Sequence, residues 1–93
     1  MSRARPYHLI LTRTAQRQLT DKLAEAVAAA AFELITGDLL DNPHRLGKRL
    51  DPPFDDRWSA RRGTYRVIYR IDEQTRTVAI VDVIARGDAY RPR

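Results

Sequence analysis

The sequence predicts an α+β domain in which helices pack on one face of a largely antiparallel sheet. An apolar run at residues 7–12 precedes an alanine-rich segment with helical spacing, and three extended runs fill the second half of the chain. A length of 93 residues allows one modest core and is too short for two. We therefore expect residues 1–93 to form a single domain: an N-terminal strand, a helical hairpin and an antiparallel β-meander.

The first strand is expected at residues 7–12, "YHLILT", because this run is short, mostly apolar and preceded by Pro6. Its apolar character predicts a buried position. Thr12 or Thr14 has a side chain suited to capping the helix that follows.

Residues 14–37 are expected to be helical, because apolar side chains recur every three or four positions and alanine favours helix. These positions are Leu19, Leu23, Val27, Ala30 or Ala31, and Leu34. Thr20 or Asp21 is able to cap a second helix, and Gly37 is expected at a left-handed C-terminal cap. The pattern leaves open whether the segment is one bent helix or two.

Residues 38–56 are expected to form a long connection, with at most a helical turn at 38–41. Four residues that interrupt regular structure support this interpretation: Pro43, Gly47, Pro52 and Pro53. Loops of this length in a compact domain are commonly functional.

The β-meander is expected from three extended runs at residues 57–61, 64–71 and 77–85, the first two joined by a turn at Arg62 and Gly63. The third run is apolar on both faces except at Asp82, so it should lie inside the sheet. Asp82 is expected to pair with an arginine, because an unpaired buried charge is costly. The tail after it is expected to form one helical turn and then to be disordered.

The second run predicts a strand with two different faces, because side chains alternate along a strand. One face carries Tyr65, Val67, Tyr69 and Ile71, and the other carries Arg66, Ile68 and Arg70. We expect the first face to join the core, together with Trp58, and the second to be exposed to anions.

The charge of the chain favours a polyanionic partner, most often nucleic acid, because the formal net charge is +5. Arginine recurs without any acidic residue from Arg57 to Ile71, and residues 44–49, "HRLGKR", form a second basic run. If both runs line the open sheet face, they form a groove with several phosphate contacts. The alternative is that these arginines are solvated and keep the sheet from pairing at its edges.

Other chemistries find little support in the composition. The chain has no cysteine and two histidines, so disulfides are excluded and we expect no metal and no cofactor. His44, in the long connection, is expected to be solvated, and the alternative is a role as an acid or base near neutral pH. The apolar run near the N-terminus is too short for a signal peptide or a membrane span, so a cytoplasmic location away from the membrane is expected.

Three segments together carry a family resemblance: "NPHRLGKRL" at 42–50, "WSARRGTYRVIYRID" at 58–72 and "VDVIARGDAY" at 81–90. In this order they resemble the RelE/ParE superfamily of type II toxin–antitoxin toxins, and most of all its RelE branch. The resemblance implies a RelE-like, microbial-RNase-like fold and a ribosome-dependent endoribonuclease that cuts mRNA in the A site of the 30S subunit. It also implies a cognate antitoxin protein as partner.

The resemblance implies roles for individual residues as well. Arg66 matches the strand arginine near the scissile phosphate, Arg86 the arginine after the last strand, and Tyr90 the C-terminal catalytic tyrosine. Arg57 matches the first of two basic residues on the preceding strand, whereas Ser59 stands where the best-known member has a lysine. RNA-binding roles are expected for five further basic residues of the two runs: Arg45, Lys48, Arg49, Arg61 and Arg62. Arg61 or Arg62 is able to replace the missing lysine charge.

Two alternatives remain at this point. ParE-like members share the fold and inhibit DNA gyrase by binding, without cutting RNA. A nonenzymatic nucleic-acid-binding module would also explain the basic runs. The combination of Arg66, Arg86 and Tyr90 favours the nuclease.

Overall fold

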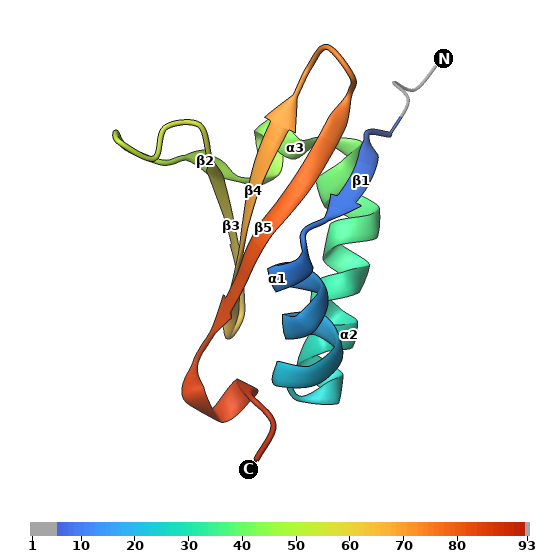
Figure 1. Ribbon diagram of the computed structural model, residues 1–93, viewed down its shortest axis with the longest axis vertical. Coiled ribbons are helices and arrows are strands. Elements are labelled where there is room, and N and C mark those ends of the chain that lie inside the picture. The colour runs from blue at the N-terminus through green and yellow to red at the C-terminus, as the bar shows by residue number, and fades with distance from the viewer. Residues whose placement is uncertain (1–5, 93) are drawn as a thin grey trace.

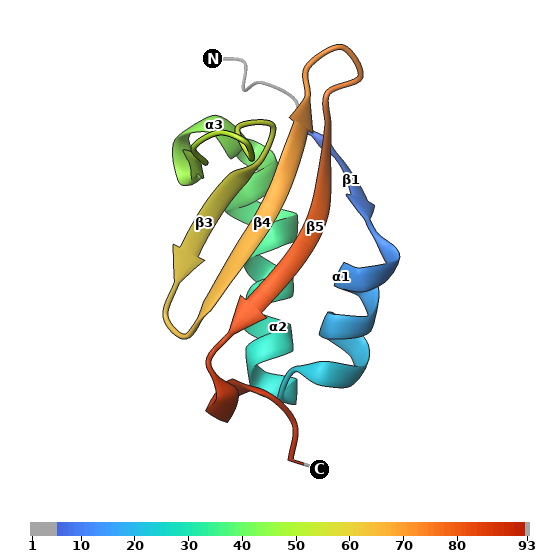
Figure 2. The ribbon, with the colours of Figure 1, turned by 60° about the vertical axis from the view of Figure 1, so that its left-hand side comes forward.

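A five-stranded sheet organises the chain in the computed structural model, which describes residues 6–92. The strand order is β1-β5-β4-β3-β2, with β1 parallel to β5 and every other neighbouring pair antiparallel. Figure 1 shows the helices gathered on one side of the sheet, and in Figure 2 α2 passes behind β4 and β5. The expected α+β architecture is confirmed.

The first strand, β1 (His8–Leu11), lies at an edge of the sheet. It pairs with β5 on one side only, and the side chain of Ile10 is 53% exposed. The prediction of a strand is confirmed, but the prediction that it is buried is wrong. An apolar run alone does not distinguish a central strand from an edge strand.

Two helices connect β1 to the rest of the sheet. The sequence left open whether this segment is one bent helix or two, and the structure shows two. Thr12 caps α1 (Arg13–Arg17), and the helix continues as the π-helical turn η1 (Gln18–Lys22). The chain is extended at Leu23 and then enters α2 (Glu25–Leu34), which continues as η2 (Ile35–Leu39). The second helix therefore begins after Ala24, and neither Thr20 nor Asp21 caps it.

Gly37 does not end the second helix. It lies inside η2, and helical conformation continues to Asp41. A methyl group on Gly37 would meet nothing within 4 Å. Because alanine restricts the unfolded chain and favours helix, we expect Gly37→Ala to raise the free energy of unfolding by about 0.5–1 kcal/mol. Urea denaturation measures this change, and a lower free energy of unfolding would contradict the helical environment described for this glycine.

The connection after the second helix is more regular than expected. It contains the short helix α3 (Pro43–Leu46) and the two-residue strand β2 (Lys48–Arg49). Proline is well tolerated in the first turn of a helix, where its missing N–H has no intrahelical partner. β2 exists because it pairs with β3, opposite Ser59 and Trp58, and a two-residue strand has no periodicity to detect in the sequence.

The β-meander is confirmed as β3 (Trp58–Arg62), β4 (Tyr65–Asp72) and β5 (Thr77–Ala85). The first turn lies one residue later than expected, because Arg62 still pairs with Tyr65, and Gly63 supplies the positive φ of 58° that the turn requires. β5 lies inside the sheet, as predicted, and its neighbours are β1 and β4.

Asp82 has a different partner from the one expected. The amide group of Gln18 donates from Nε2 to Asp82 Oδ1 (2.5 Å) and accepts the Val83 N–H at Oε1 (2.7 Å). Asp82 is half-buried. The expected pairing with arginine is therefore wrong, and the side chain of Gln18 covers the edge of β5 beyond the end of β1.

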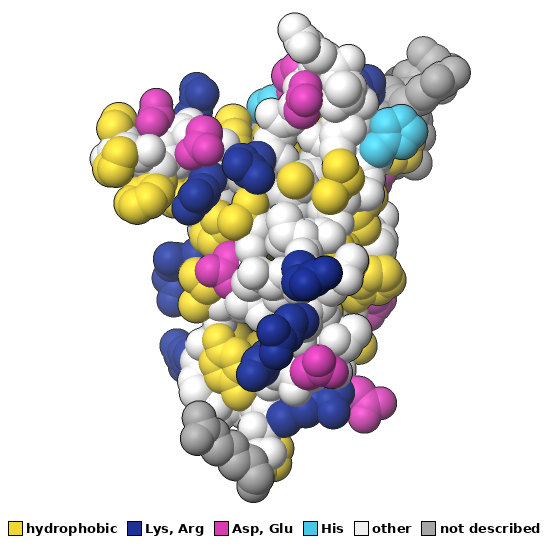
Figure 3. All heavy atoms as spheres, viewed as in Figure 1, with side chains coloured by type: hydrophobic (Ala, Val, Ile, Leu, Met, Phe, Trp, Pro, Cys, Tyr) yellow, Lys and Arg dark blue, Asp and Glu magenta, His cyan; other side chains and the backbone are white. Residues whose placement is uncertain are grey.

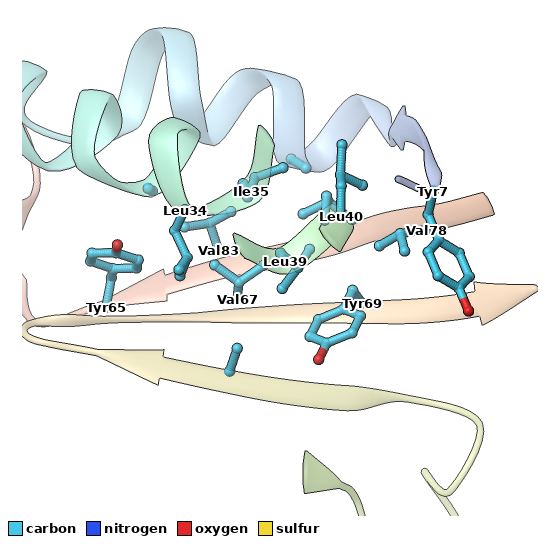
Figure 4. Close-up of a cluster of buried hydrophobic side chains, with 14 of the residues drawn as sticks. Tyr7, Leu34, Ile35, Leu39, Leu40, Tyr65, Val67, Tyr69, Val78 and Val83 are labelled. Carbon is cyan, nitrogen blue, oxygen red and sulfur yellow. The ribbon is translucent and has the colours of Figure 1, made fainter. Parts of the chain in front are cut away.

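The core lies between the helices and one sheet face, as Figure 4 shows. Its members include Leu34, Ile35, Leu39, Val67 and Val83, and Tyr65 and Tyr69 belong to it as predicted. Trp58 packs against this cluster, which confirms its predicted role. The open face of β4 carries Arg66 and Arg70, both exposed, as the alternation predicted.

Tyr69 is fully buried, and its hydroxyl donates a hydrogen bond to the backbone oxygen of Pro43 (2.5 Å). Burial raises the pKa of Tyr69 to about 12, because the phenolate would be desolvated. The folded state holds this proton more tightly than the unfolded chain does, so the stabilisation is complete below pH 10 and is lost as the pH rises to about 12.

We therefore expect the free energy of unfolding to fall by up to about 3 kcal/mol across this interval, at about 1.4 kcal/mol per pKa unit. Denaturant titrations at several pH values measure the slope. Tyr69→Phe should have a shallower slope than the wild type, and an equal slope would contradict the assignment.

The C-terminal tail packs against the break between the two helices. After the 3-10 turn η3 (Gly87–Ala89), Tyr90 forms a backbone bridge with Leu23. The guanidinium of Arg91 donates to the backbone oxygens of Leu23 and Thr20, each at 3.0 Å. The helical turn is confirmed, but the expected disorder is wrong as far as the described residues extend.

Candidate nucleic-acid interface

The open face of the sheet brings together basic side chains from three strands. Cross-strand partners share a face, and Arg61 pairs with Arg66, which in turn pairs with Ile84. Figure 3 shows Lys and Arg side chains both along the sheet and over α1. Like charges at directly opposed strand positions destabilise a sheet, so an anionic ligand would relieve the repulsion between Arg61 and Arg66.

Arg61, Arg66 and Arg86 line one hollow of about 240 Å³, which we call the arginine hollow. Arg86 follows β5 directly, and its backbone N–H donates to the oxygen of Thr64 (3.1 Å), so the end of β5 is fixed against the β3–β4 turn. The three arginine side chains are exposed. Within residues 6–92, the close contacts between basic and acidic side chains are His44–Glu73 and Arg57–Asp56, so the three guanidinium groups of the hollow are free to meet a ligand.

Two further predicted residues lie on or near this face. Lys48 pairs with Ser59 and therefore shares the face of Arg61 and Arg66. Arg57 precedes β3, and its guanidinium lies 5.4 Å from the centre of the Phe54 ring. The Nε atom of Arg57 is buried without a hydrogen-bond partner.

Three other predicted RNA-binding residues lie elsewhere. Arg62 faces the helices, in the row of Tyr65, and lines a groove beside α2. Arg49 pairs with Trp58 on the core side and donates from Nε to the backbone oxygen of Asp55 (2.7 Å). Arg45 lines a separate hollow on α3. The two basic runs therefore do not form one continuous groove, because alternate residues of a strand point to opposite faces.

Tyr90 is separated from the arginine hollow by the last residues of β5. Its hydroxyl oxygen accepts the Ala85 N–H (3.1 Å), and its ring packs against the core and lines a different hollow, with Arg17 and Lys22. Ala85 also lines the arginine hollow, so this one residue of β5 contacts both the Tyr90 hydroxyl and the arginine hollow. The catalytic role of Tyr90, like those of Arg57, Arg66 and Arg86, remains a prediction.

His44 takes part in a polar cluster that the sequence did not predict. Its Nε2 lies 2.6 Å from Glu73 Oε2, and its ring packs edge-on against Trp58, with centroids 5.3 Å apart. Tyr7 donates its hydroxyl proton to the same carboxylate, and its pKa is raised by burial and by Glu73. His44 is exposed, as expected, but it also makes these contacts. The cluster ties the β4–β5 turn to α3 and to the start of β1, and it lies at the end of β4 opposite to the arginine hollow.

Other kinds of site have less support in the described part of the chain. Residues 6–92 contain no group of three or more His, Cys, Asp or Glu side chains arranged to hold a metal ion. None of the helices described is long and apolar enough to cross a membrane.

The fold and the arginine hollow define a small basic protein whose open sheet face is suited to binding a phosphate. The family model for the ParE toxin of the type II toxin–antitoxin system parDE matches residues 9–90. The chain belongs to the RelE/ParE family of type II toxin–antitoxin toxins.

Among curated proteins, the chain is similar to Toxin RelE of Mycobacterium tuberculosis, with 47% identity over 98% of this chain and 93% of that protein. It is also similar to Toxin RelG of the same organism, with 46% identity over 92% of this chain and 98% of that protein. Among solved structures, it matches the crystal structure of the toxin–antitoxin complex RelBE2 from M. tuberculosis. The TM-score is 0.84, with 44% identity over 88% of this chain and 100% of that chain.

Proposed function

We propose that this protein is the toxin of a type II toxin–antitoxin module and cuts mRNA in the ribosomal A site. The observation that carries the proposal is the arginine hollow, in which β3, β4 and the end of β5 each contribute a guanidinium group. Family membership and the relatives named RelE and RelG support the same function.

The proposed reaction is attack of the RNA 2′-hydroxyl on the neighbouring phosphate. It needs the attacking oxygen deprotonated, the negative charge on the phosphorane stabilised and the leaving 5′-oxygen protonated. Arginine does not lose its proton in proteins, so Arg61, Arg66 and Arg86 act as electrostatic clamps on the phosphate. Guanidinium groups suit this task because their fixed N–H fork matches two phosphate oxygens.

The isolated arginine hollow has no histidine to act as an acid or base, so the ribosome is expected to supply much of the rate by aligning the mRNA. His44 points into the Glu73 cluster at the other end of the sheet, so it is not available as an acid or base at the arginine hollow. The free protein should therefore be a poor nuclease. Alignment of the mRNA by the ribosome then supplies much of the rate, since correct positioning contributes several kcal/mol, up to about 7–11 kcal/mol in favourable cases.

A cell-free bacterial translation reaction tests the proposal. Purified protein is added with and without ribosomes, and the mRNA ends are mapped by primer extension. Cuts within A-site codons that require ribosomes and disappear with Arg86→Ala are expected. Intact mRNA and normal translation would contradict the proposal.

Substitution of Tyr90 distinguishes a catalytic protein from one that only binds RNA. Under the nuclease proposal, the Tyr90 hydroxyl group, as its phenolate, takes the proton from the RNA 2′-hydroxyl. Tyr90→Phe keeps the aromatic ring but removes this group, so cleavage should slow by about 10²–10⁴-fold while RNA affinity is kept. Single-turnover cleavage and equilibrium binding measure the two quantities. Wild-type cleavage in Tyr90→Phe would remove the hydroxyl from the mechanism, and thermal denaturation of the variant checks that the lost contact with Ala85 leaves the fold intact.

A second candidate function is inhibition of DNA gyrase, and the match to a family model described as ParE toxin favours it. Under this alternative the arginines form a binding surface and no RNA is cut. A gyrase supercoiling assay distinguishes the two functions, because only the ParE-like protein should inhibit it at concentrations that leave mRNA intact.

The proposed partner is a cognate antitoxin, as in the toxin–antitoxin complex of the structural relative. A segment that masks both the arginines and the apolar groove beside α2 should be acidic or amphipathic. Expression of the toxin alone should inhibit growth, and coexpression with the antitoxin should restore it.

A further inference from the structure

A second hollow lies on the other side of the end of β5, and Tyr90 is the one lining residue that the proposed mechanism uses. Thr14, Arg17, Gln18, Lys22 and Tyr90 line it, and its volume is about 420 Å³, within the range of small-ligand sites. We call it the α1 hollow. It adjoins the arginine hollow, because Ala85 lines the arginine hollow and donates its N–H to the Tyr90 hydroxyl.

The walls of the α1 hollow are held in place before any ligand arrives. Both ends of the Gln18 amide are bonded to β5, at Asp82 and at Val83. Tyr90 is fixed by its hydroxyl and by its backbone bridge to Leu23. Such preorganisation lowers the entropy cost of binding.

The charged groups of the hollow are cationic and exposed. Arg17 and Lys22 have no ion-pair partner within residues 6–92, and Arg13 lies one helical turn before Arg17 on the same side of α1. The nearby carboxylate of Asp82 is occupied by Gln18, whereas Asp21 is exposed beside Lys22. A pair of cations beside an aromatic ring is the combination that holds single-stranded RNA, through phosphate contacts and base stacking.

We infer that the α1 hollow is a second RNA subsite, which takes the nucleotide next to the one whose phosphate lies in the arginine hollow. Arg17 and Lys22 contact the backbone phosphate, and the Tyr90 ring supports the base. The inference rests on the proposed function, because that function places the RNA phosphate in the arginine hollow and so sets the direction in which the strand runs. The binding role that it assigns to Tyr90 needs the aromatic ring and not the hydroxyl group.

Equilibrium binding of a short, fluorescently labelled RNA tests the subsite without ribosomes. Every 2′-hydroxyl of the RNA is methylated, so it cannot be cut. Arg17→Ala/Lys22→Ala should bind about tenfold or more weakly at low salt. The slope of log affinity against log salt should be shallower by about 0.7 for this variant, since one single-strand phosphate contact is lost. Tyr90→Leu should weaken binding without changing this slope, whereas Tyr90→Phe should keep the affinity.

A charge-matched control is Ala29→Glu/Thr36→Glu, which lowers the net charge equally at exposed positions of the second helix. It should bind nearly as the wild type does. An equal loss in the control, unchanged binding by Arg17→Ala/Lys22→Ala, or no wild-type binding would each overturn the subsite. Ribosome-dependent cleavage is not needed for this result, so absence of cuts together with the expected binding pattern would refute the proposed function and leave the subsite standing.

Discussion

Arg66→Ala is expected to reduce ribosome-dependent mRNA cleavage by about 10²–10³-fold. Arg66 faces Arg61 across the β3–β4 pair and lines the arginine hollow with Arg86, so its loss removes a charge placed to stabilise the phosphorane. Its side chain is exposed and makes no contact with the core, so the free energy of unfolding should change by less than about 0.5 kcal/mol. Single-turnover cleavage on ribosomes programmed with a defined mRNA measures the rate.

Arg70→Ala is the matched control, because Arg70 lies on the same strand and the same face but lines a different hollow with Asp56, Asp72 and Glu73. Its cleavage rate should stay close to that of the wild type. Equal losses in the two variants would show that general positive charge on the sheet, and not the arginine hollow, governs the activity.

Gly47→Ala is expected to lower the free energy of unfolding by about 1–3 kcal/mol or more. Gly47 lies where α3 turns into β2, and an added Cβ would overlap the Tyr69 hydroxyl and lie 2.8 Å from the backbone oxygen of Ser59. The buried Tyr69 and the backbone of β3 have little freedom to move, so the clash would displace β2 or break the hydrogen bond from Tyr69 to Pro43.

Urea denaturation of Gly47→Ala beside Gly37→Ala makes this test specific, since the same substitution at Gly37 meets no neighbour and should stabilise the fold. If both variants behave alike, the close approach at Gly47 is not what the fold requires. Gly47 has an extended backbone that other residues adopt, so the expected loss comes from the clash of the added Cβ and not from backbone strain.

Periodicity predicted most of the fold. The strand alternation of β4 assigned Tyr65 and Tyr69 to the core and Arg66 and Arg70 to the open face, because every other side chain must share a face. Short elements were not predicted, because they contain too few residues to show a periodic pattern. β2 is only two residues long, and it is defined by its pairing with β3 and not by any pattern of its own.

The candidate site was predicted only in part, because it depends on register and on contacts between distant residues. Sequence reasoning could not choose between Arg61 and Arg62, whereas the pairing of β3 with β4 places Arg61 beside Arg66 and turns Arg62 toward the helices. The Gln18–Asp82 contact spans 64 residues, and no local signal predicts it. The position of Tyr90 likewise follows from the packing of the tail against Leu23.

The proposed function requires the arginines of the arginine hollow to act together on one phosphate. The most direct measurement is the single-turnover cleavage rate on programmed ribosomes for the wild type, Arg66→Ala, Arg86→Ala and the double variant. A large loss is expected in each single variant. The loss in the double variant should be smaller than the product of the two, because the effects of residues that act as a unit are not additive. Wild-type rates in both single variants would contradict it.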